Sequence, residues 1–209
     1  MESAFLTKLK QRLQLPLPGS DVQFEMAHVN RAKLKHEDLH PSEFRTSAVL
    51  ILLIQKGNEL YIPLTERNTY NGAHSGQVSF PGGKFDNDDI TLERTALREC
   101  YEEIGLKDNI EVLGELSPLY IPVSKFMVHP FVGILNREEI NYSPHTTEVK
   151  SILELSLKDL MLPHLVKETV VEPSPGIKFK TPYFDVEGRI VWGATAMILN
   201  EFKHLLQSL

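Results

Sequence analysis

The chain has 209 residues, of which 42% are hydrophobic and 24% are charged, as in an ordinary globular protein. This length suits one α/β domain, so we expect a single domain over residues 1–209. The formal net charge of −6, from 22 Lys and Arg against 28 Asp and Glu, argues against a nucleic-acid partner or attachment to a membrane surface. The longest apolar run, Ala48 to Ile54, is too short to span a bilayer and predicts a buried strand.

The single cysteine, Cys100, excludes an intramolecular disulfide. The N-terminal segment has neither a sustained apolar stretch nor a small-residue cleavage site, so it does not read as a secretory signal. A reducing cytoplasm is the simplest compartment for such a chain. The residues do not fix the oligomeric state, and a homodimer is left open.

The first half of the chain alternates apolar and turn-forming segments. Apolar residues at helical spacing near the N-terminus stop at Pro16, and two β-rich runs flank the turn residues Lys56 to Asn58. We expect, in order, a helix at about 2–15, irregular chain at 28–41, a hairpin of strands 47–55 and 59–65, and a long loop at 68–81 with a short strand near Val78.

The second half begins with a helix. Asp88 or Asp89 is the expected N-terminal cap, and Gly105 is the expected left-handed C-terminal cap after Ile104. We then expect strands at 111–121 and 126–135, a loop at 141–147, a short helix at 157–161, strands at 168–171 and 177–184, and a C-terminal helix at about 193–206. Because helices and strands are interleaved, we predict an α/β (α+β) fold with a mixed β-sheet sandwiched between α-helices.

The helix that ends at Ile104 carries an acidic face. Glu99, Glu102 and Glu103 lie at i, i+3 and i+4, so their carboxylates project from one side within about one turn. The opposite side is apolar and consists of Leu97, Cys100 and Ile104. A cluster of oxygen ligands of this kind suits Mg²⁺ or Mn²⁺, which also bridge phosphate oxygens.

An isolated Glu-x-x-Glu-Glu is usually a solvated surface, but here its context is specific. Arg98 precedes the acidic group and could orient it, and Gly82 and Gly83 precede the helix by a short loop. The segment resembles the Nudix hydrolase family, whose box is Gly-x5-Glu-x7-Arg-Glu-U-x-Glu-Glu-x-Gly-U, where U is a bulky apolar residue. The positions that match its second half are Arg98, Glu99, Glu102, Glu103, Gly105 and Leu106.

Two positions depart from this pattern. Asp89 stands where the family has its first Glu, and the interval from Asp89 to Arg98 contains one extra residue. Cys100 stands at the first U, and we interpret it as a core residue and not as a nucleophile.

The resemblance implies hydrolysis of a nucleoside diphosphate linked to another moiety, with Mg²⁺ or Mn²⁺ as cofactor. Glu99 and Glu103 are then the principal metal ligands, Glu102 is a further ligand or a water-orienting group, and the Gly82 carbonyl is a candidate backbone ligand. Water is the nucleophile, and Glu102 and Glu103 are catalytic candidates. Glu148, on a downstream loop, is a candidate general base, although a solvent-exposed loop residue is an equally good interpretation.

The stretch before the box resembles the signature of the coenzyme A diphosphatase branch, Leu-Leu-Thr-x-Arg-[Ser/Ala]-x3-Arg-x3-Gly-x3-Phe-Pro-Gly-Gly. The residues that fit in register are Leu64, Thr65, Arg67, Gly76, Phe80, Pro81, Gly82 and Gly83, whereas Pro63, Asn68 and Gly72 depart from it. The resemblance implies cleavage of coenzyme A or acyl-CoA to 3′,5′-ADP and (acyl-)4′-phosphopantetheine.

Substrate phosphates require local cations in a chain of negative net charge. Arg67 is the leading candidate, with Lys84 and His74 as lesser ones, and His74 is equally well interpreted as a surface loop residue. We expect Phe80 to pack beneath its loop and Trp192 to anchor the C-terminal helix in the core.

Two alternatives remain open. Gly72 replaces an arginine that could bind phosphate in a bidentate manner, which leaves ADP-ribose or a dinucleotide as other substrates of the same chemistry. The second alternative is a non-catalytic nucleotide-binding module on the same fold, which the retention of all three box carboxylates disfavours.

Overall fold

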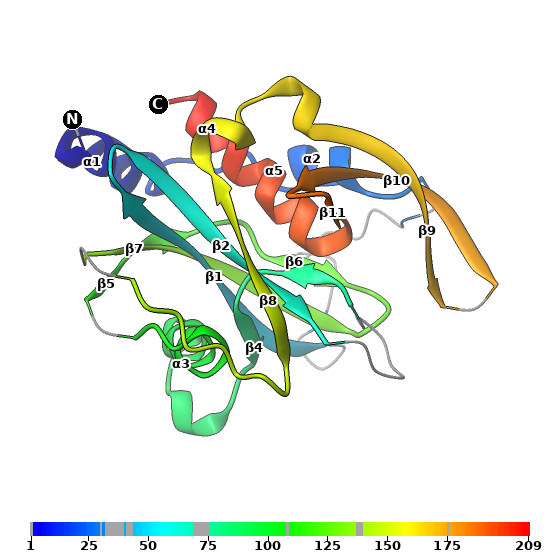
Figure 1. Ribbon diagram of the computed structural model, residues 1–209, viewed down its shortest axis with the longest axis horizontal. Helices are drawn as coiled ribbons and strands as arrows, with labels where there is room; N and C mark the ends of the chain where they lie inside the picture. The colour runs from blue at the N-terminus through cyan, green and yellow to red at the C-terminus, as the bar shows by residue number, and fades with distance from the viewer. Residues whose placement is uncertain are drawn as a thin grey trace.

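The computed structural model describes residues 2–29, 31, 40, 44–68, 76–107, 109–136, 140–174 and 176–209 (Figure 1). The α-helices are α1 (Glu2–Leu13), α2 (Ser20–Gln23), α3 (Leu92–Ile104), α4 (Leu157–Leu160) and α5 (Gly193–Gln207), and short 3₁₀ turns are η1 (Phe24–Met26), η4 (Asn87–Asp89) and η5 (Pro163–Leu165). The strands are β1 (Arg45–Lys56), β2 (Glu59–Arg67), β3 (Val78–Ser79), β4 (Gly82–Lys84), β5 (Ile110–Glu115), β6 (Leu119–Ile121), β7 (Phe126–Leu135), β8 (Val149–Ser156), β9 (Val166–Ser174), β10 (Ile177–Val186) and β11 (Arg189–Val191).

The larger sheet is mixed. Its central path runs β3-β2-β1-β7-β5, in which β1 and β7 are parallel over ten residue pairs and the other neighbours are antiparallel. β1 shares one edge between two partners, because β2 pairs with its end at 54–56 and β4 pairs with its beginning at 47–49. β4 is thereby held beside α3, and this contact positions the site described below.

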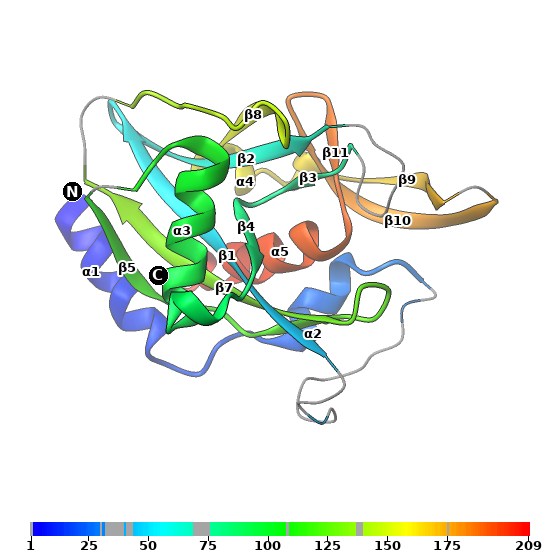
Figure 2. The ribbon, with the colours of Figure 1, turned by 90° about the horizontal axis from the view of Figure 1, so that it is seen from below.

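Helices cover both faces of this sheet, with α3 on one side and α1 and α5 on the other (Figures 1 and 2). β1 is buried on both faces, which explains its unbroken apolar run. Its residues Leu50 and Leu52 pack in the cluster beneath α3, whereas Ile51 and Leu53 pack in the larger cluster on the side of α5. The fold is therefore the mixed α+β sandwich expected from the sequence.

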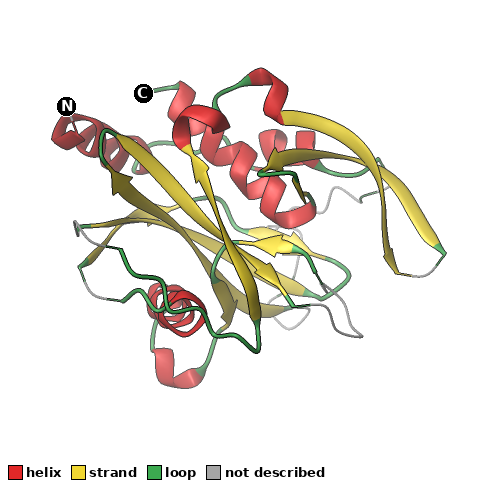
Figure 3. Ribbon diagram, in the orientation of Figure 1, coloured by secondary structure: helices red, strands yellow, loops and turns green. Residues whose placement is uncertain are grey.

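A second, three-stranded sheet, β11-β10-β9, follows in the chain, and its β9–β10 hairpin extends away from the larger sheet (Figure 3). Its base joins the larger hydrophobic cluster, which contains Phe184 of β10 together with Leu9 of α1 and Phe202 of α5. This shared core supports our proposal that the chain is one domain.

Most expected elements are confirmed, including the β1–β2 hairpin, the strand at 126–135, the short helix at 157–160 and the C-terminal helix. The strands expected at 168–171 and 177–184 are longer, and the N-terminal helix ends at Leu13. No helix in the described part of the chain is both long and apolar enough to cross a bilayer.

Two expectations about these elements were wrong, and strand β8 was missed. The stretch 111–121 forms two strands, β5 and β6, which pair with different ends of β7. β8 was not expected, and it adds to β2 as a further antiparallel strand. Neither Asp88 nor Asp89 caps α3, since the cap is Thr91, whose hydroxyl accepts the N–H of Arg94.

Glu66 joins β2 to β8 and β11 on the face of the sheet that carries α5. It is only 6% exposed and accepts hydrogen bonds from Lys150 Nζ at 2.7 Å, Ser151 Oγ at 2.8 Å and Arg189 Nε at 3.1 Å. The bond from Lys150 is the main reason that the pKa of Glu66 falls from 4.5 to about 2, although burial opposes the shift. A carboxylate with a lowered folded-state pKa stabilises the fold above its unfolded-state pKa, and this stabilisation is lost as the pH falls from about 4.5 to about 2.

We expect Glu66→Gln to lower the free energy of unfolding at pH 7 by about 1–3 kcal/mol, because a buried amide accepts these charged donors less well. The difference between variant and wild type should shrink between pH 4.5 and pH 3, as measured by denaturant unfolding. The matched control is Glu168→Gln, which removes an exposed pair with Lys180 and should change stability by less than about 0.5 kcal/mol. Equal pH dependence in Glu66→Gln and wild type would contradict this account.

Candidate active site

α3 is held rigidly at both ends. Thr91 caps its first turn, and Gly105 ends it at φ 80°, in the left-handed region that favours glycine. Its apolar side, with Ala96, Cys100 and Ile104 all fully buried, packs on β1 and β7. Burial of this side turns the acidic side toward β4 and the end of β2.

Glu99 lies directly against β4. A Cβ built on Gly83 would overlap the Glu99 carboxylate, so a larger residue would displace this carboxylate from β4. Burial raises the pKa of the Glu99 carboxyl, although the adjacent Arg98 opposes the shift. Gly83 therefore makes room for a carboxylate in a partly desolvated position.

Glu103 is the most buried of the three glutamates, at 3% exposure. Burial, with smaller contributions from the charges of Glu99 and Glu148, raises its pKa to about 7, while Arg67 and a backbone hydrogen bond from Gly82 oppose the shift. The guanidinium of Arg67 lies 3.7 Å from the Glu103 carboxylate. The site thus holds a carboxylate that its surroundings neutralise only in part.

Arg98 organises the exposed edge of the acidic face. Its guanidinium donates to both oxygens of Asp89, at 2.7 and 3.0 Å, and Nη1 donates to Glu99 and Glu102, each at 2.8 Å. Asp89 is 6% exposed and also accepts from the Thr95 hydroxyl. Arg98 holds the pKa of Asp89 far below its usual range, so this carboxylate stays ionised and keeps the arginine in place. The expectation that Arg98 orients the acidic group is confirmed.

The loop before β8 closes the site next to the last turn of α3. Ser143 and His145 donate backbone N–H groups to the carbonyls of Ile104 and Glu103, at 2.9 and 3.0 Å. A Cβ on Gly105 would come within 2.7 Å of Ser143, so the glycine also allows this loop to dock. Glu148 is half-exposed on the loop, and its charge contributes to the raised pKa values of Glu99 and Glu103. The structure therefore places Glu148 near the two buried carboxylates.

Of the two remaining expected site residues, one is exposed and the other lies outside the described residues. Lys84 is exposed at the end of β4, and its carbonyl accepts from Arg98 Nη2 at 3.2 Å. His74, together with Gly72, lies outside the described residues.

The expectations for the packing residues can be compared directly. Phe80 is 2% exposed, as expected for a residue that packs beneath its loop. The expectation that Trp192 is a core residue is wrong, because it is only partly buried and meets Phe179 edge-on, with ring centroids 5.8 Å apart. Cys100 is a free buried thiol whose pKa burial raises to about 12, which confirms a core residue and not a nucleophile.

The donor set fits a hard cation. In the ranges that the structure describes, no three His, Cys, Asp or Glu side chains already converge in a metal-binding group. Glu99 and Glu103 nevertheless bring two partly uncompensated carboxylates together beside β4, and Mg²⁺ usually keeps several waters and needs only one or two protein carboxylates. Gly82 contacts Glu103 through its backbone N–H, and the Glu102 carboxylate accepts from Arg98 at 2.8 Å.

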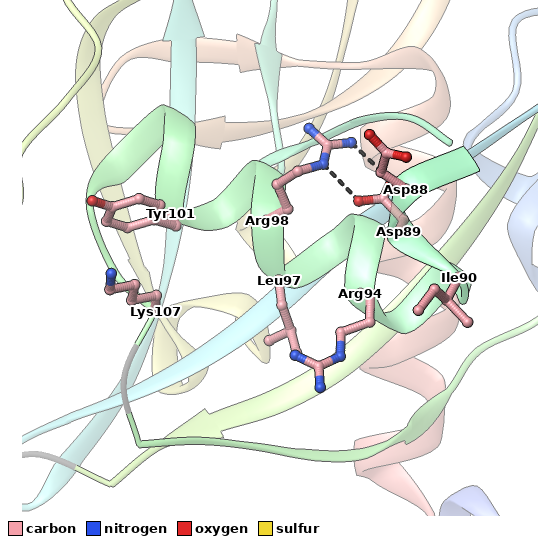
Figure 4. Close-up of a pocket in the computed structure, with 8 residues that line it drawn as sticks. All are labelled: Asp88, Asp89, Ile90, Arg94, Leu97, Arg98, Tyr101 and Lys107. Carbon is pink, nitrogen blue, oxygen red and sulfur yellow. Dashed lines mark hydrogen bonds and ion pairs between the residues drawn. The ribbon is translucent and has the colours of Figure 1, made fainter. Parts of the chain in front are cut away.

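A separate surface hollow of about 530 Å³ lies along the outer side of α3 (Figure 4). Leu97, Tyr101 and Arg94 line it together with Asp88 to Ile90 and Lys107, and Arg98 lies at its border with the acidic face. The described lining includes none of the three site glutamates, so the hollow is distinct from the candidate active site.

Two residues of the site were missed or misread in the sequence. Thr65 is fully buried, with Oγ1 3.5 Å from Glu103 Oε2. The alternation of β2 could have indicated this, because Thr65 and Arg67 are two residues apart and so face the same side of the sheet. Asp89 was interpreted as a helix cap, whereas it binds Arg98.

Comparison with known proteins agrees with this geometry. The NUDIX domain model matches residues 44–172. An uncharacterized Nudix hydrolase NudL from Yersinia pestis (strain Pestoides F) is 32% identical over 204 residues, which cover 97% of this chain and 94% of that protein.

Two solved structures share the fold. A MutT protein from Methanosarcina mazei Go1 has a TM-score of 0.52 at 16% identity and covers 82% of this chain and 100% of its own. The Nudix hydrolase RenU from M. smegmatis has a TM-score of 0.52 at 14% identity and covers 79% of this chain and 87% of its own. The family match over most of the chain, together with the arginine-bound acidic face of α3, shows that this chain belongs to the Nudix family.

Proposed function

We propose that the protein is a Mg²⁺- or Mn²⁺-dependent diphosphatase that cleaves a nucleoside diphosphate linkage, with coenzyme A or acyl-CoA as its substrate. The observation that carries the proposal is the pairing of Glu99 and Glu103 beside Gly83, with Arg67 3.7 Å from Glu103. A buried and a partly buried carboxylate can bind a divalent cation, and a nearby arginine can bind phosphate oxygens. The site therefore contains groups for both partners of a metal–diphosphate complex.

Each residue of the site has a distinct proposed role. Glu99 and Glu103 would hold the cation, with Glu102 as a further ligand or water-orienting group and the Gly82 carbonyl as a backbone ligand. A bound divalent cation neutralises charge on the diphosphate and lowers the pKa of coordinated water. Arg67 orients the diphosphate, with His74 and Lys84 as additional cationic contacts, and Glu148 accepts the proton of the attacking water.

Coenzyme A is the preferred substrate because the segment before the box places two of its matching residues at the site. Thr65 and Arg67 of β2 both face Glu103, and Phe80 anchors the turn into β4. These described residues of the matched segment thus lie on the side of the site that we assign to the diphosphate. We also propose that the protein acts on this small molecule in the cytoplasm.

The direct test is incubation of the purified protein with coenzyme A and Mg²⁺ or Mn²⁺. We expect 3′,5′-ADP and 4′-phosphopantetheine as products, and a loss of about 100-fold or more in kcat for Glu103→Gln, because the amide binds the cation poorly. The matched control is Glu93→Gln, an exposed glutamate on the same helix, which should leave the rate unchanged. Comparable turnover of coenzyme A, ADP-ribose and a dinucleotide would count against a dedicated coenzyme A enzyme. Equal rates for Glu103→Gln and wild type would reject the role of Glu103 in the mechanism.

Arg67 should matter for substrate affinity. We expect Arg67→Lys to raise KM about tenfold with a smaller change in kcat, because lysine keeps the charge but loses the bidentate fork. Arg94→Lys, at an exposed position of α3, serves as the control in the same steady-state assay. An unchanged KM would mean that Arg67 does not contact the phosphates.

Gly83 should matter for cation binding. In Gly83→Ala the new methyl group must displace the Glu99 carboxylate, so we expect about tenfold weaker Mn²⁺ binding by calorimetry. Combining it with Glu99→Asp, whose side chain is one methylene shorter, should recover part of the affinity. The idea fails if Gly83→Ala binds Mn²⁺ as tightly as wild type.

A further inference from the structure

His145 connects the metal-binding helix to the loop that carries Glu148. Its backbone N–H donates to the carbonyl of Glu103 at 3.0 Å, and its own carbonyl accepts the N–H groups of Glu148 and Val149, both at 2.9 Å. One residue thus fixes where the Glu148 backbone lies relative to the last turn of α3. Asn68 secures the other side of this loop, because its N–H donates to the Glu148 carbonyl and its amide donates to the Thr146 carbonyl.

The imidazole of His145 also faces the Glu148 carboxylate. Nδ1 lies 3.5 Å from Glu148 Oε1 and 3.2 Å from Thr147 Oγ1. The side chains of His145 and Glu148 are 55% and 52% exposed, so neither serves to fill the core. An exposed glutamate has many rotamers, and a neighbouring donor that favours one of them reduces the entropy cost of holding the carboxylate in place.

We propose that His145 is a positioning residue that orients the Glu148 carboxylate toward the attacking water. This inference rests on the proposed function, in which Glu148 accepts the proton of that water. Nδ1 lies beside one carboxylate oxygen, Oε1, and leaves the other free to accept from water. His145 acts through Glu148 and does not itself contact the diphosphate.

The test is a double-mutant cycle of His145→Ala and Glu148→Gln, measured as kcat and KM with coenzyme A and Mg²⁺. We expect His145→Ala to lower kcat about tenfold with KM within about twofold, and to have less than about a twofold effect when Glu148→Gln is already present. His145→Asn should recover part of kcat, because its side-chain amide can donate from a similar position. His164→Ala removes an exposed histidine from η5 and should behave as wild type.

Three results would overturn the proposal. One is a kcat for His145→Ala equal to that of His164→Ala. Another is a raised KM with unchanged kcat, which would make His145 a phosphate contact. The third is a decrease in kcat for His145→Ala that is as large in the Glu148→Gln background as in wild type, which would mean that His145 acts independently of Glu148.

A crystal structure of His145→Ala separates this proposal from the proposed function. Displacement of the Glu148 side chain would support the positioning role even if wild type hydrolysed none of the diphosphates in the panel, in which case only the proposed function fails. An unmoved Glu148 would overturn the positioning role even in an active enzyme.

Discussion

The site depends on one guanidinium held between acids. Arg98 binds Asp89 with two short hydrogen bonds and binds Glu99 and Glu102 with its remaining terminal nitrogen. Charge-assisted hydrogen bonds of this kind are roughly twice as strong as neutral ones, and the fork geometry of arginine fixes direction as well as distance. Without this cation, the carboxylates of one helix face would repel each other and turn toward solvent. The arginine lets them remain close but leaves Glu103 short of positive charge.

The lack of positive charge around Glu103 results from the packing of the chain and not from its composition alone. Glu103 lies at the meeting point of α3, β2 and β4, where burial disfavours its charged form and Arg67 compensates only from 3.7 Å. Glycines at two points permit the close approach: Gly83 leaves space for Glu99, and Gly105 leaves space for the loop with Ser143. For the cation that we propose, such a preorganised site lowers the cost of binding, because the cost of desolvating its carboxylates has been met during folding.

Much of this could be predicted from the sequence. The acidic face, the role of Arg98, the left-handed cap at Gly105 and the β1–β2 hairpin follow from short-range rules of helix periodicity, capping and turn chemistry. The residues that escaped prediction depend on tertiary contacts. Asp89 precedes a helix and has the chemistry of a cap, but Thr91 takes that position and frees Asp89 to bind a side chain nine residues later. β8 was missed because it is an added strand whose pairing with β2 bridges a large separation in sequence. Glu148 could be proposed only as a guess, since its nearness to α3 depends on two backbone hydrogen bonds that Ser143 and His145 of its own loop donate to the last turn of α3.

The burial of Cys100 has a consequence for how the protein tolerates oxidising conditions. Its thiol is fully enclosed beneath α3 and remains protonated, since burial raises its pKa to about 12, whereas peroxides and disulfides react with exposed thiolates. The groups proposed for chemistry and binding are carboxylates, imidazoles, a guanidinium and an ammonium group, none of which forms disulfides or sulfenic acids. Thiol oxidants therefore have no reactive cysteine through which to inactivate the folded protein.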